Sequence, residues 1–233
     1  MNEICKKGEK NMEKNRVLEI IINLLEGIKN DNKLVDSSTI NGKITLRGCK
    51  YLLNQTIRQY TLPNNHYFVS EKAKELWDKI STDNMFNYEY QNKVTKNVPG
   101  EVLINKYRGG ERKARKAEVL KYGQKFTYKD VFTDEHIVPV KNIIDELLDL
   151  SVLSYNEIEK VLDKIYICKM LKSEDRAIKN QRNRSTDYRE VVVFDYKEAE
   201  IKLLNFDYIS VLKTLISEDK RKLDELSAEK CSV

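Results

Sequence analysis

Apolar residues recur at helical spacing in the first third of the chain. They lie three or four positions apart over residues 11–29 and 71–80, which predicts two amphipathic helices. Ser70 is a typical N-cap residue for the second helix. A third helix is expected over residues 50–60, since Pro63 would end it. This part of the chain is therefore predicted to be mainly helical.

Beyond residue 100 the pattern switches between helical and strand-like spacing. Strands are predicted over residues 126–138, 165–168 and 191–194. Helices are predicted over residues 111–121, 142–150, 156–162, 173–180 and 209–230. Residues 81–100 are rich in Asn, Thr and Tyr, which is typical of loops and strands, and we place a domain boundary there. The expected fold is α+β, with a mainly helical region over residues 1–100 and a mixed domain with a C-terminal helix over residues 101–233.

The composition narrows the class of protein. The chain has 233 residues, of which 40% are hydrophobic and 34% charged, as expected of a water-soluble globular protein. No stretch approaches the roughly 20 apolar residues that cross a bilayer, and the first sixteen residues do not resemble a signal peptide. We therefore expect a cytoplasmic protein without a membrane partner. The four cysteines form no CxxC pair, so neither a disulfide framework nor a structural zinc is predicted.

Basic residues gather in two blocks. Residues 106–125 contain eight Lys and Arg against two acidic residues, and residues 169–189 contain seven against three. Positive charge concentrated in this way is typical of a surface that binds the phosphates of double-stranded DNA, and the alternative is two solvated helix faces. The candidate DNA contacts are Arg112, Lys113, Arg115, Lys116, Arg176, Arg182 and Arg184.

One of the two histidines has acidic neighbours. His136 follows Asp134 and Glu135 at the end of a predicted strand, and Pro139 comes three residues later. A neutral imidazole is a suitable general base near pH 7, and carboxylates are the ligands that hard cations prefer. The segment therefore indicates metal-assisted hydrolysis.

Residues 131–179 resemble the ββα-metal core of the HNH endonucleases. Glu135-His136-Ile137-Val138-Pro139 matches the family's acidic-His-[IV]-x-Pro signature, residues 165–168 supply the second strand, and residues 172–176 fit the start of the metal-binding helix. Glu174 or Asp175 stands where the family usually has His or Asn. The resemblance covers about a fifth of the chain, and it implies that residues 142–162 are an inserted helical pair.

The resemblance implies a metal-dependent DNA endonuclease. His136 would be the general base, and Glu135 and Asp175 would hold one Mg²⁺ or Mn²⁺, with Asp134 and Glu174 as alternate ligands. A symmetric double-strand cut needs two one-metal sites, so a homodimer is expected. Restriction or phage defence is the setting that analogy suggests. Residues 39–90 would either recognise DNA or serve as a packing domain, and both alternatives stay open.

Two other functions compete with this one. The apolar run over residues 191–194 is followed by Asp195 and Lys197, which is similar to the half-motif of the PD-(D/E)xK nucleases, with Asp175 as the first carboxylate. In that case His136 would be incidental. The other alternative is a non-catalytic DNA-binding protein, in which the basic blocks bind phosphate and the carboxylates only cap helices.

Overall fold

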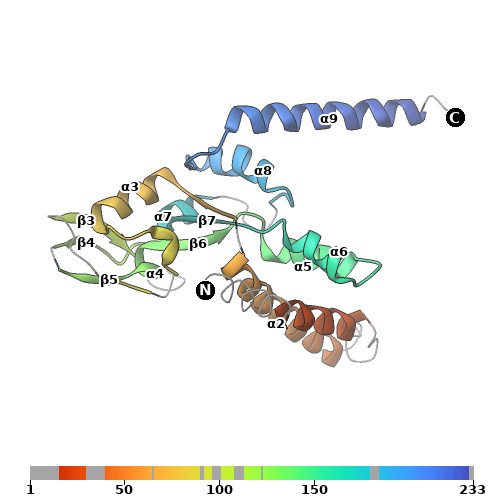
Figure 1. Ribbon diagram of the computed structural model, residues 1–233, viewed down its shortest axis with the longest axis horizontal. Coiled ribbons are helices and arrows are strands. Elements are labelled where there is room, and N and C mark those ends of the chain that lie inside the picture. The colour runs from red at the N-terminus through yellow and green to blue at the C-terminus, as the bar shows by residue number, and fades with distance from the viewer. Residues whose placement is uncertain are drawn as a thin grey trace, which may run out of the picture. The chain divides into compact units, whose positions relative to one another are not determined.

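The computed structural model describes residues 16–29, 40–64, 66–89, 92–95, 101–107, 113–121, 123–178 and 184–230 (Figure 1). These residues form a mixed α+β protein, as the sequence predicts at that level. The chain divides into two compact units. Unit 1 comprises Met1–Tyr67 and His136–Ile167, and unit 2 comprises Phe68–Glu135 and Cys168–Val233. The domain boundary predicted between residues 100 and 101 lies inside unit 2.

Unit 1 is built from helices. They are residues 16–29, α2 (Ile40–Asn64), α5 (Val140–Asp149) and α6 (Tyr155–Leu162). Each helix buries an apolar face, as Ile57 of α2 and Leu147 of α5 illustrate, and α5 packs against both α2 and α6. The helical pair α5–α6 stands where the sequence predicts an insertion between two strands.

Unit 2 combines short strands with helices. Two antiparallel pairs are β2 (Lys93–Thr95) with β5 (Lys125–Thr127), and β3 (Val102–Lys106) with β4 (Lys116–Leu120). A three-stranded sheet has the order β1 (His66–Val69), β7 (Tyr166–Leu171) and β6 (Phe132–His136), and each of these strands runs across the division between the units. The helical elements are α3 (Glu71–Ile80), η1 (Met85–Asn87), α4 (Tyr128–Val131), α7 (Lys172–Ala177), α8 (Tyr188–Glu190), η2 (Val191–Tyr196) and α9 (Tyr208–Lys230).

Aromatic residues form the core of unit 2. The Trp77 ring packs edge-to-face on Phe132, with 5.6 Å between ring centres, and Tyr128 stacks on Phe132 at 4.9 Å. All three side chains are fully buried, and Trp77 Nε1 donates a hydrogen bond of 2.7 Å to the carbonyl of Asp83. Trp77 therefore belongs to the hydrophobic core of this unit. Because Phe132 begins β6, this core fixes the strand that leads to Glu135.

Several elements agree with the sequence patterns. Helix α3 begins after Ser70, whose Oγ accepts a hydrogen bond of 3.2 Å from the backbone N–H of Ala73, as predicted. The order of β6, α5, α6, β7 and α7 is strand, helical pair, strand, helix, again as predicted.

Three predicted elements are wrong. The helix over residues 111–121 is replaced by β4, because residues with good helix propensity pair with β3 instead. The single strand over residues 126–138 is interrupted by α4. The strand over residues 191–194 is helical, since Asp187 caps α8 and the helix continues directly into η2, which buries three consecutive valines, Val191, Val192 and Val193. No helix in the described part of the chain is long and apolar enough to cross a bilayer.

Candidate functional site

Two acidic residues from distant parts of the sequence meet in unit 2. Glu135 lies near the end of β6 and Asp175 lies in α7, and their carboxyl groups share a hydrogen bond that Glu135 donates when it is protonated. Arg184 Nη1 donates a hydrogen bond of 2.8 Å to Glu135 Oε1, and the Arg184 side chain is only 1% exposed. We call these two carboxyl groups the acid pair.

Burial disfavours the charged form of both carboxyl groups in the acid pair. Burial, followed by the nearby charge of Asp175, raises the pKa of Glu135 to about 7, and Arg184 only partly offsets this. Burial also raises the pKa of Asp175. The pair therefore keeps a proton at pH values where isolated carboxyl groups have lost theirs. A divalent cation placed between the two groups would displace that proton.

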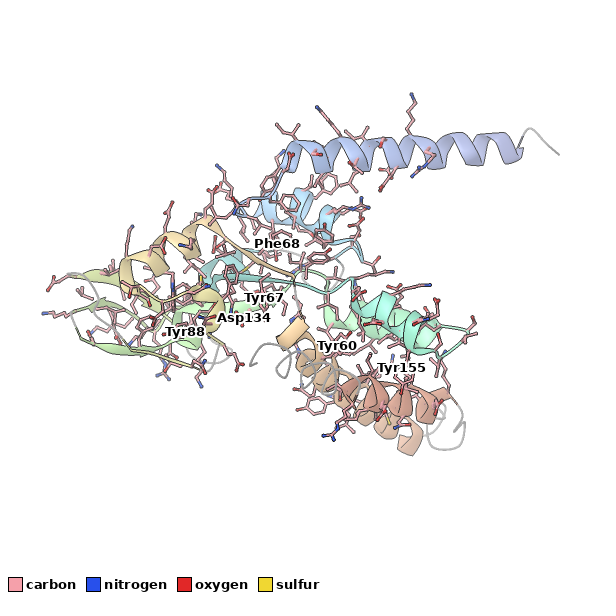
Figure 2. All side chains as sticks on the ribbon, in the orientation of Figure 1. Tyr60, Tyr67, Phe68, Tyr88, Asp134 and Tyr155 are labelled. Atoms are coloured by element: carbon pink, nitrogen blue, oxygen red, sulfur yellow. The ribbon has the colours of Figure 1, made fainter. Side chains whose placement is uncertain are left out.

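The other two predicted metal ligands have different partners. Asp134 Oδ1 accepts hydrogen bonds from Lys169 Nζ at 3.0 Å and from Tyr128 Oη at 3.2 Å. The Lys169 ammonium also donates a hydrogen bond of 2.6 Å to the carbonyl of Tyr88, so it links Asp134 to the segment after η1. Figure 2 labels Asp134 and Tyr88. These contacts give Asp134 a structural partner of opposite charge.

Glu174 stabilises the start of α7. Its Oε2 accepts hydrogen bonds from Ser70 Oγ at 2.6 Å and from the backbone N–H of Leu171 at 2.9 Å. The second contact caps the first turn of the helix. Because Asp175 is the next residue, Glu174 positions the acid pair.

The donor set of the acid pair fits a hard cation. Two carboxyl groups offer only oxygen ligands, which Mg²⁺ prefers, and Mg²⁺ commonly takes one or two protein carboxylates and keeps several waters. Among the described residues, no three His, Cys, Asp or Glu side chains converge in the geometry of a metal site. The remaining positions on a bound ion would thus go to water and substrate oxygens.

His136 has a buried, neutral ring in unit 1. It is 9% exposed, and the Arg58 guanidinium lies 3.3 Å from its Nδ1. Burial, and then the charge of Arg58, lower the pKa of His136 to about 3. Since arginine can only donate, Nδ1 accepts and the ring proton sits on Nε2. Within the described residues, Nε2 has no hydrogen-bond partner.

The predicted DNA contacts fall into three groups. Lys113, Arg115 and Lys116 are exposed on or beside β4, and the Arg176 guanidinium carbon lies 4.1 Å from the centre of the Tyr107 ring. Arg184, by contrast, is buried against Glu135, whereas a DNA contact requires a surface position. Arg112 and Arg182 lie outside the described residues.

The PD-(D/E)xK half-motif loses its structural basis. Asp195 belongs to η2 and Lys197 follows it, so neither stands at the end of a strand. Lys197 lines a groove of about 1110 Å³ together with residues of α3 and α9. Burial raises the pKa of Asp195, while the charge of Arg184 acts in the opposite direction.

Some residues of the site carry no signal in the sequence. The roles of Arg184 beside Glu135 and of Arg58 beside His136 depend on long-range packing, and no spacing predicts them. Lys172 and Tyr107 are also absent from the predicted set, although Lys172 lies in the second basic block.

No family model matches the chain, and neither a curated protein nor a solved structure does.

Proposed function

We propose that the chain is a metal-dependent endonuclease that hydrolyses phosphodiester bonds in double-stranded DNA. Glu135 and Asp175 would hold one Mg²⁺ or Mn²⁺. The observation that carries this proposal is the acid pair, in which two carboxyl groups 40 residues apart in sequence are brought together despite their repulsion. Burying such a pair lowers the free energy of unfolding, and a bound cation would offset this loss of stability.

The order of the secondary structure supports an HNH-like arrangement. Glu135 stands in the strand β6, the strand β7 is adjacent in the sheet, and α7 then presents Asp175. The metal, when bound, would stabilise the charge that develops on the phosphate and the leaving oxygen. The chain's own contribution is to hold the two ligands, with Arg184 fixing Glu135 and Glu174 fixing the first turn of α7.

The role of His136 as general base stays a prediction from the sequence. The ring is neutral, as a base must be, but the donation from Arg58 places the proton on Nε2. A base that acts through Nε2 needs the other tautomer, so Arg58 would have to release Nδ1. A substrate phosphate that binds Arg58 would draw the guanidinium away and raise the pKa of the imidazole.

The test is cleavage of plasmid DNA by the full chain. We expect nicking or linearisation with Mg²⁺ or Mn²⁺ and none with EDTA. We expect His136→Ala to lose cleavage by about 10²–10⁴-fold while it retains DNA binding. Binding without cleavage by the unmutated protein in either metal would instead identify a non-catalytic DNA-binding protein. The homodimer and the role in restriction or phage defence stay predictions.

A further inference from the structure

Two basic residues of α7, Lys172 near its start and Arg176 in its last turn, stand on either side of Asp175 in the sequence. Arg176 Nη1 donates a hydrogen bond of 3.0 Å to the carbonyl of Lys172, and the Arg176 guanidinium lies over the Tyr107 ring. Lys172 is half-buried, and it lies close enough to Arg176 and Lys129 for their positive charges to disfavour its own. Asp130 and Asp175 are the acidic groups that face it. The cationic side chains of Lys172, Arg176 and Lys129 thus lie near two acidic side chains. One of these, Asp175, belongs to the acid pair.

Three elements of unit 2 hold this cluster together. Tyr107 follows β3, and its backbone N–H donates a hydrogen bond of 2.7 Å to the carbonyl of Asp130 in α4. Lys172 and Arg176 both belong to helix α7, and the Arg176 guanidinium contacts the Tyr107 ring. The β3–β4 ladder continues by the hydrogen bond of 3.0 Å from Arg115 N–H to the Lys106 carbonyl, so the exposed Arg115 and Lys116 lie beside the end of β3 that leads to Tyr107.

We propose that Lys172, Lys129 and Arg176, with Arg176 oriented by Tyr107, form a subsite for a phosphate of the DNA backbone next to the acid pair. This inference rests on the proposed function and names the substrate contact that it requires. A guanidinium stacked on an aromatic ring loses less freedom when it binds phosphate. Three cations outnumber the two acids even without a metal, and a cation bound to the acid pair would add to this positive excess.

The test is the salt dependence of binding to a short DNA duplex, measured by fluorescence anisotropy in EDTA so that no cleavage occurs. The slope of log K against log salt is negative, and each lost phosphate contact reduces its magnitude by about 0.9. We expect this decrease, with binding about tenfold weaker at moderate salt, for Lys172→Gln and for Lys129→Gln. Lys79→Gln is the matched control, because Lys79 is an exposed lysine of unit 2 in the last turn of α3.

Lys129 is exposed, so its variant is expected to fold even if Lys172→Gln does not. Slopes equal to that of Lys79→Gln in both variants would overturn the subsite, as would a wild-type protein that does not bind the duplex. The plasmid assay decides the function separately. If the slopes decrease as expected but no metal supports cleavage, the subsite stands and the endonuclease proposal fails.

Discussion

Asp175→Asn is expected to reduce Mg²⁺-dependent cleavage by on the order of 10²–10³-fold, with no loss of DNA binding. The substitution keeps the size of the side chain and removes one of the two charged ligands of the proposed metal. Its partner Glu135 would remain beside Arg184 and, as a single carboxylate, would hold the ion more weakly. The measurement is the rate of plasmid cleavage at several Mg²⁺ concentrations, with duplex binding measured in parallel.

Asp195→Asn is the matched control for this experiment. Asp195 is also an aspartate near Arg184, and the substitution removes the same charge. We expect it to cleave at close to the wild-type rate. A loss of cleavage in Asp195→Asn with none in Asp175→Asn would contradict the assignment of the metal to the acid pair.

The second large effect concerns stability and pH. In the absence of divalent cations, the free energy of unfolding is expected to fall as the pH rises from about 4.5 to above 7. The reason is that the pKa of Glu135 is raised from 4.5 in the unfolded chain to about 7 in the folded protein. Below pH 4.5 both states hold the proton. Between pH 4.5 and about 7 the unfolded chain has released the proton while the folded protein still holds it, so rising pH favours unfolding, and above pH 7 both states are deprotonated and the loss is complete.

Glu135→Gln is expected to flatten this pH profile, with an effect on the order of a few kcal/mol between pH 4.5 and 7, because the amide has no proton to lose there. The measurement is denaturant unfolding at several pH values in EDTA. Glu75→Gln, an exposed carboxyl of α3, is expected to keep the wild-type profile. If the profiles of Glu135→Gln and the wild type are parallel, the acid pair does not hold the proton assigned to it.

Local patterns predict a large part of this fold. Helix α3 and its Ser70 cap, and helices α5 and α6, follow from apolar spacing and end signals that a few neighbouring residues determine. These elements were therefore accessible from the sequence alone.

The errors arise where tertiary contacts decide the structure. Residues 116–120 have good helix propensity, yet they form β4 because β3 supplies a pairing partner. Val191, Val192 and Val193 favour a strand by propensity, yet they are buried in η2, which follows α8 without a break. No window of a few residues contains the information that reverses these preferences.

The site shows the same division. The signature around His136 indicated Glu135 and Asp175 as partners, and the structure brings these two acids together. Asp134 is paired with Lys169, and Glu174 uses its Oε2 to cap α7, which only the packed structure reveals. The sequence motif therefore indicates the type of chemistry, whereas the packing of the fold determines which of the neighbouring acidic residues come together.

The most direct measurement is a calorimetric titration of Mg²⁺ or Mn²⁺ into the metal-free full chain at pH 6.5, in buffers with different ionisation enthalpies. The proposed metal site is expected to bind one ion per chain, with release of a proton from the acid pair, and to lose this binding in Asp175→Asn. An ion that binds equally well to Asp175→Asn, or a wild-type chain that binds no divalent ion, would contradict this assignment.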